Sequence, residues 1–289
     1  MNKLQHLLIG VVMGVTLSMG GVPSVSFAQT EVGQAPQTTD RYQQLQQRDY
    51  QSGSQAYDVV NHDQPDTISP QDYPVSRIDF SNLDRLNRAQ PATAYLTQEN
   101  LGKSKGRERQ LFKPTGWSNQ PKRVNGQRVF PVNRGHLIAY TCTFNLDENG
   151  KYQPGAKGSI DNPKNLFTQT AFANQKVMTI NEQAVRNALA QGKHVIYQVT
   201  PVFQGNDLMA KGVWVQAVSS DGSFHFNRYL YNVQPGLAFD YATGRSHVDS
   251  QMTVPTPMNY ENYRKHALKP ISTGYQTHRH EKVRVRHFF

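Results

Sequence analysis

The segment Phe130-Pro131-Val132-Asn133-Arg134-Gly135-His136-Leu137-Ile138-Ala139-Tyr140 places a histidine, an arginine and a glycine inside an apolar run. The alternation of apolar residues predicts a half-buried strand. Gly135, next to His136, indicates a backbone that bends or is approached closely. A histidine there is either a hydrogen-bonded core residue or a catalytic group, and four residues alone do not decide between the two.

Amide side chains are concentrated downstream, in residues 162–175 (NPKNLFTQTAFANQ). Amide groups can ligate a hard cation or bind phosphate and backbone groups. The apolar spacing that follows predicts a helix from Asn174 to Gln191. On that helix Glu182 lies roughly 80° around from Asn174, and Arg186 shares the face of Glu182, so all three border one site. The alternative for Glu182 and Arg186 is an ordinary exposed i,i+4 ion pair.

Strand-like runs after this helix predict the rest of the fold. They cover residues 194–203, 213–218 and 224–233, and Ser219-Ser220-Asp221-Gly222 has the composition of a hairpin turn. Apolar structure begins near Tyr73. We expect an α+β domain over residues 73–250, with a central antiparallel sheet flanked by helices.

The two ends of the chain differ in composition from this domain. Residues 1–28 combine Lys3, an apolar run and Ser26-Phe27-Ala28, which predicts a signal peptide and secretion; an uncleaved membrane anchor is the alternative. Residues 29–72 are polar and predict a disordered leader. Residues 251–289 form a basic tail that either adds affinity for phosphate or is simply solvated.

The net charge and the cysteine content limit the class of partner and the chemistry expected of the chain. The formal net charge of +10 favours a polyanionic partner, with nucleic acid ahead of cell-wall polymer or a membrane surface. The single cysteine, Cys142, excludes an intrachain disulfide. We expect Cys142 to be a small buried hydrophobic residue rather than a nucleophile.

Together these segments resemble the DNA/RNA non-specific endonucleases of the ββα-metal class, most closely the streptococcal secreted, streptodornase-like DNases. The family signature, Asp-Arg-Gly-His followed by a helix with a metal-binding Asn, corresponds to Asn133-Arg134-Gly135-His136 and Asn174. Glu182 and Arg186 follow Asn174 at the family spacing of eight and twelve residues. The resemblance covers roughly residues 73–245. It implies a ββα-metal finger and a hydrolase that cuts DNA, and also RNA, to 5′-phosphorylated fragments with little sequence specificity.

The resemblance also implies a role for each site residue. His136 would be the general base. Asn174 would be the one direct protein ligand of Mg²⁺, with Mn²⁺ as a substitute, and Glu182 would orient water around the metal. Arg134 and Arg186 would neutralise phosphate charge. Arg107 and Arg109 would contribute further positive charge toward phosphate. Asn165 and Gln169 would either steady the site or contact the substrate backbone.

One residue departs from the family pattern. Asn133 stands where the signature has Asp, so hydrogen bonding is preserved and the negative charge is lost; we expect activity to survive. We expect no small-molecule cofactor, no obligate protein partner and a monomer, and export suggests a role in degrading host DNA. The alternatives are a catalytically silent nucleic-acid or cell-surface binding protein that retains the fold, and a phosphodiesterase acting on wall teichoic acid.

Overall fold

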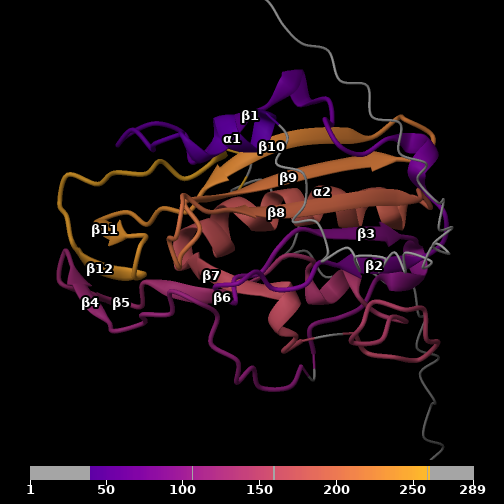
Figure 1. Cartoon of the computed structure of the whole chain (residues 1–289), viewed down its shortest axis with the longest axis horizontal. Helices are drawn as coiled ribbons and strands as arrows, with labels where there is room; N and C mark the ends of the chain where they lie inside the picture. The colour runs from indigo at the N-terminus through magenta and orange to yellow at the C-terminus, as the bar shows by residue number, and fades with distance from the viewer. Residues whose placement is uncertain (1–39, 106, 159, 259, 261–289) are drawn as a thin grey trace, which may run out of the picture. The chain divides into compact units, whose positions relative to one another are not determined.

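The computed structural model describes residues 40–105, 107–158, 160–258 and 260. Six strands form a central antiparallel sheet in the order β1-β10-β9-β8-β3-β2 (Figure 1). Their bounds are β1 Tyr57–Val59, β2 Arg77–Phe80, β3 Ala92–Leu96, β8 Val195–Val202, β9 Gly212–Ser219 and β10 His225–Tyr231. The predicted α+β class with a central antiparallel sheet is confirmed, and β8, β9 and β10 coincide closely with the three predicted runs.

Both faces of this sheet are covered. All eight residues of β9 are buried. The helix α2, Thr179–Ala190, packs against β8 and β9 (Figure 1). Among the residues of β9, Gln216 accepts a hydrogen bond from the backbone N–H of Asp66 at 2.6 Å. A sheet with helix on one face and chain on the other buries apolar side chains on both, which explains the near-continuous apolar sequence of β8 and β9.

The predicted disordered leader is wrong for residues 40–72. This segment contains the helix α1, Asp40–Gln46, and the strand β1, which pairs with β10. Leu45, Ala56 and Val60 are buried in the core. A few apolar anchors suffice to order a polar segment when an exposed sheet face and sheet edge are available to it, and composition averaged over the segment hides those anchors.

The predicted finger is a hairpin followed by a helix. Strand β6, Val132–His136, pairs antiparallel with β7, Leu166–Thr170, and the chain then enters the helical segment that ends in α2. Gly135 faces Phe167 across this hairpin. A Cβ atom at position 135 would lie 2.4 Å from Oε1 of Gln169, so the hairpin requires glycine there.

The helix differs from the prediction in its first turns. Residues Ala173–Met178 (η6) form a π-helix, and regular α-helix begins at Thr179. The expected angle of roughly 80° between Asn174 and Glu182 assumed a regular α-helix and is therefore wrong, because i→i+5 bonding changes the rotation per residue. The Thr179 hydroxyl donates to the Asn174 carbonyl at 3.1 Å, which ties the two ends of the π segment together.

The remaining elements are short. They are the ribbons β4 Lys122–Val124 with β5 Gln127–Val129 and β11 Leu237–Asp240 with β12 Arg245–Val248, and the 3-10 turns Asn61–Asp63, Pro70–Asp72, Gln98–Asn100, Tyr140–Cys142 and Pro163–Asn165. No helix in the described residues is long and apolar enough to cross a membrane. The signal peptide prediction and the basic residues of the tail lie outside the described residues. Residues 251–258 pack back on the domain, where Gly53 donates to the Thr253 carbonyl at 2.8 Å.

Candidate active site

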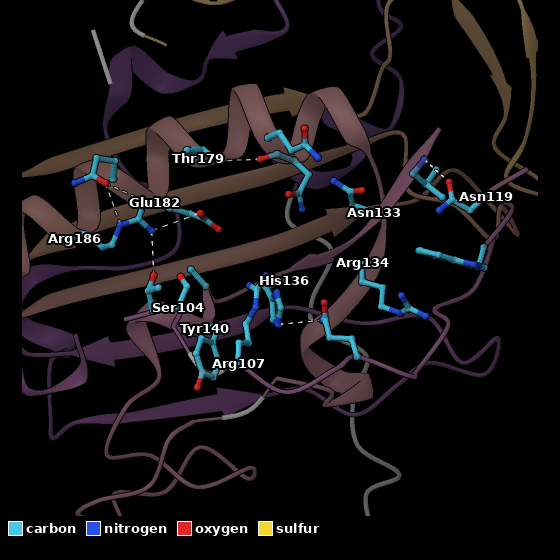
Figure 2. Close-up of a pocket in the computed structure, with 18 residues that line it drawn as sticks. Ser104, Arg107, Asn119, Asn133, Arg134, His136, Tyr140, Thr179, Glu182 and Arg186 are labelled. Atoms are coloured by element: carbon cyan, nitrogen blue, oxygen red, sulfur yellow. Dashed lines mark hydrogen bonds and ion pairs between the residues drawn. The ribbon is translucent and has the colours of Figure 1, made fainter. Parts of the chain in front are cut away.

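A polar pocket of about 670 Å³ lies between the β6–β7 hairpin and the helix α2. It brings together six of the nine predicted site residues: Arg107, Arg134, His136, Asn174, Glu182 and Arg186. In Figure 2, Thr179, Glu182 and Arg186 project from α2, while His136, Arg134 and Asn133 come from β6. Segments far apart in sequence therefore meet at one cavity, as the sequence pattern predicted.

His136 is held by one hydrogen bond to the backbone. Its Nε2 atom lies 3.1 Å from the carbonyl oxygen of Ile160. Because a carbonyl only accepts, Nε2 carries the proton, and Nδ1 keeps its lone pair. Burial lowers the pKa of His136 to about 4; the Ile160 carbonyl and Asp161 oppose this shift, and Arg107 adds to it. The imidazole is therefore neutral at neutral pH and able to accept a proton.

Gln110, Ile160 and Asp161 were missed by sequence reasoning. The Gln110 amide nitrogen donates to the same Ile160 carbonyl at 3.0 Å. The Asp161 carboxylate accepts from the backbone N–H groups of Leu111 and Phe112 at 2.9 and 3.0 Å. Residues 160–161 thus connect His136 to the loop that carries Arg107. The position of Ile160 and Asp161 next to the amide-rich segment was the one sign in the sequence that they belong to the site. A sequence pattern does not predict that a backbone carbonyl contacts a histidine.

Asn174 is oriented by a buried neighbour. Its amide nitrogen donates to Oε1 of Gln169 at 3.0 Å. Within the described residues no donor reaches the Asn174 amide oxygen, so this oxygen is available as a ligand. A hard amide oxygen with the Glu182 carboxylate on the same pocket fits a divalent cation that prefers oxygen donors. The described residues contain no cluster of three His, Cys, Asp or Glu side chains that would hold a metal by themselves.

Glu182 and Arg186 form the expected i,i+4 pair, but not on an exposed face. Arg186 Nη1 lies 3.6 Å from Glu182 Oε2, and both side chains are less than one-fifth exposed. Arg186 also donates to Oε1 of Gln183 and to the Thr141 hydroxyl. Burial raises the pKa of Glu182, and Arg186 opposes that shift. The pair therefore lines the pocket with one carboxylate and one guanidinium whose positions are fixed.

Arg134, Arg107 and Arg109 differ in where they lie relative to the pocket. Arg134 donates to the carbonyl oxygens of Phe112 and Leu111, and its guanidinium lies 4.7 Å from the centre of the Trp117 ring. It therefore anchors the loop as well as lining the pocket. Arg107 is exposed at the pocket, whereas Arg109 is exposed and is not among the lining residues.

Asn165 and Gln169 are placed to steady the site and not to contact substrate. Both side chains are fully buried, so as placed here they do not reach a substrate. The Asn165 amide bonds both backbone groups of Ile138, accepting at 2.8 Å and donating at 3.0 Å, and so fixes the chain after His136. Gln169 positions Asn174, and its own amide nitrogen has no partner among the described residues.

Cys142 agrees with expectation, and Asp147 lies in a turn. Cys142 is buried, and burial raises the pKa of its thiol to about 11. Asp147 accepts from the backbone N–H groups of Asn149 and Lys151 at 2.9 and 2.8 Å, which is a turn and not a metal site. Neither residue contributes a reactive group to the pocket.

A family comparison decides the class of protein. Residues 71–221 match the family model described as DNA/RNA non-specific endonuclease. The chain belongs to the DNA/RNA non-specific endonuclease family. The matched range contains the hairpin, the π-helical turn, α2 and every residue that lines the pocket. The chain is thus a hydrolytic nuclease, and its substrate is nucleic acid.

Solved structures show the same fold. NucA from Streptococcus agalactiae with no metal bound is 26% identical, with a TM-score of 0.57 over 74% of this chain and 99% of that one. NucA with magnesium ion bound is 29% identical, with a TM-score of 0.55 over 66% and 86% of the two chains. Sda1 nuclease with bound zinc ion is 22% identical, with a TM-score of 0.53 over 67% and 97%, and shows the fold alone.

Proposed function

We propose that this endonuclease is secreted and uses a divalent metal, Mg²⁺ first and Mn²⁺ as a substitute, to hydrolyse DNA and also RNA with little sequence preference. The observation that carries the proposal is that a neutral histidine and an amide oxygen with no donor line one polar pocket. The magnesium-bound NucA structure supports the choice of metal.

His136 acts as the general base in this proposal. With its Nε2 proton directed at Ile160, Nδ1 takes a proton from the water that attacks phosphorus. The new P–O bond forms as the bond to the 3′ oxygen breaks, which leaves a 5′-phosphate and a 3′-hydroxyl. The low pKa of His136 keeps the base neutral before the reaction, and protonation during the step is favoured by the Ile160 carbonyl and by Asp161.

Asn174 would hold the metal through its amide oxygen, with Gln169 fixing the amide orientation. When bound, such an ion stabilises negative charge that develops on the phosphate and on the leaving oxygen. Glu182 accepts hydrogen bonds from water in the site, and Arg186 contributes positive charge toward a phosphate. Arg107 adds a cation at the pocket on the side of His136.

The Asn at position 133 is compatible with this chemistry. Asn133 lines the pocket and pairs with Gln169 across the hairpin. The Ile160 carbonyl orients His136, and Asp161 raises its pKa. Neither the orientation nor this effect on the pKa of His136 depends on a carboxylate at position 133. DNA and RNA share the phosphate backbone, so a site that engages phosphate favours action on both nucleic acids.

The direct test is cleavage of supercoiled plasmid by the purified protein with Mg²⁺, with and without a chelator. We expect nicking and linearisation with the metal, none with the chelator, and fragment ends that a ligase can rejoin because they carry 5′-phosphate. RNA of matched length tests the second substrate. Absence of cleavage across a series of divalent metals would favour the alternative, a catalytically silent nucleic-acid binding protein.

A further inference from the structure

One long stretch of this chain carries cations but no carboxylates. From Arg109 to Leu146 the sequence contains no Asp or Glu. The ion pairs of the described residues all involve other segments. Within this stretch the β4–β5 hairpin projects between Asn119 and Val132, two residues that line the pocket and are joined by a 3.2 Å hydrogen bond from the Val132 N–H to Oδ1 of Asn119.

The two faces of the β4–β5 hairpin differ. Arg123 and Arg128 are directly opposite each other across the ribbon and share one face, and both are exposed. Val124 belongs to the other face and contacts Gly236, where its Cγ1 atom would lie 2.3 Å from an added Cβ. This places the hairpin beside β12 (Figure 1), and Arg123 and Arg128 are exposed on its other face.

Two like charges directly opposite on a ribbon destabilise it. No ion pair among the described residues involves Arg123 or Arg128, so their charges are available to an anion outside the protein. Phe130 is about half exposed, but the Arg128 guanidinium lies 5.0 Å from its ring centre and covers the ring. The face is therefore built for anionic oxygens rather than for base stacking.

We propose that the Arg123–Arg128 face binds the phosphate backbone of duplex DNA outside the scissile site and so holds the duplex across the pocket. This proposal rests on the proposed function for the identity of the polyanion. The contacts carry no sequence information, since they address backbone charge alone. They explain how a pocket that engages one phosphodiester acquires affinity for long substrates.

The test uses the full chain carrying His136→Ala, so that bound DNA stays intact, with a 30-base-pair duplex of mixed sequence and a chelator. Fluorescence anisotropy gives the dissociation constant over a range of salt concentrations. Arg123→Ala with Arg128→Ala is expected to weaken binding about 10-fold at moderate salt and to reduce the salt slope by about 2. Lys151→Ala with Lys157→Ala removes the same charge from exposed positions elsewhere and is expected to leave the slope unchanged.

Arg123→Glu separates binding from folding. It replaces a like-charge pair by an opposite-charge pair with Arg128, so the thermal midpoint is expected to hold or rise while duplex affinity falls at least about 10-fold. In the active chain that retains His136, Arg123→Glu is expected to lower the ratio of kcat/KM on plasmid to kcat/KM on a dinucleotide. Unchanged affinity and slope in both arginine variants would overturn the proposal. Since binding is measured without cleavage, failure of plasmid cleavage would contradict the proposed function and leave this result standing.

Discussion

His136 Nε2 lies 3.1 Å from the Ile160 carbonyl oxygen, and the next residue, Asp161, binds two backbone N–H groups of the loop that carries Arg107. Two consecutive residues thus hold both His136, the proposed base, and a cationic loop of the pocket. This arrangement assigns the proton of His136 to Nε2 and leaves Nδ1 for the reaction. It also supports the expectation that activity survives with Asn at position 133.

The pH dependence of cleavage follows from the low pKa of His136. A general base works in its neutral form, and a pKa of about 4 keeps His136 neutral well below the usual histidine range. At pH 5 about nine-tenths of the imidazole would be neutral, against about 3% for an unshifted histidine. We expect kcat/KM to change less than about 2-fold from pH 7 to pH 5 and to fall below that. A steep loss centred near pH 6.5 would contradict the burial of this base.

Arg107→Ala is expected to move the acid limb of the pH–rate profile toward higher pH. Arg107 lowers the pKa of His136, so its removal raises that pKa and shifts the acid limb of kcat/KM toward higher pH. The pH–rate profile measures this shift. An acid limb that stays in place would show that the Arg107 charge does not act on His136.

Asp161 is expected to stabilise the loop that carries Arg107. Asp161→Ala removes the acceptor for the Leu111 and Phe112 N–H groups and should lower the free energy of unfolding by about 1–3 kcal/mol. The displaced Arg107 should raise KM for plasmid. Asp161→Asn keeps an acceptor but removes the charge, so the pKa of His136 should fall and the acid limb should move to lower pH. Identical pH profiles for the two variants and the parent would refute this role.

Asn174→Ala tests the metal site. Loss of the amide oxygen should abolish the thermal stabilisation that Mg²⁺ gives the parent and lower cleavage by more than about 100-fold. Asn187→Ala removes an exposed amide from the following helix, α2, and serves as the control. Equal stabilisation of both variants by Mg²⁺ would place the metal elsewhere.

Gly135→Ala tests the packing of the hairpin. Its new Cβ would lie 2.4 Å from Oε1 and 2.7 Å from Cβ of Gln169, the residue that orients Asn174. Overpacking of this kind costs about 1–3 kcal/mol, and here it also disturbs the metal ligand. We expect a lower midpoint in chemical denaturation together with a higher Mg²⁺ requirement. A variant with unchanged stability would show that the hairpin can separate at little cost.

The sequence predicts correctly those elements whose structure depends on local hydrophobic periodicity. The strands β8, β9 and β10 and the helix after Asn174 follow directly from hydrophobic periodicity, and the spacing of Asn174, Glu182 and Arg186 indicated one site. The π-helical turn was not predictable, because it depends on how the hairpin meets the helix. For Asn165 and Gln169 the resemblance left support of the site and contact with substrate both open, and only tertiary packing shows that both side chains are buried. Order in residues 40–72 depends on a sheet face that only the folded domain provides.

The most direct measurement is the rate of plasmid nicking by His136→Ala beside the parent and His225→Ala, an exposed histidine of β10, with Mg²⁺ at neutral pH. The account predicts that His136→Ala is slower by about 10²–10⁴-fold, while His225→Ala matches the parent. Cleavage by His136→Ala at the parental rate would contradict the assignment of His136 as the base.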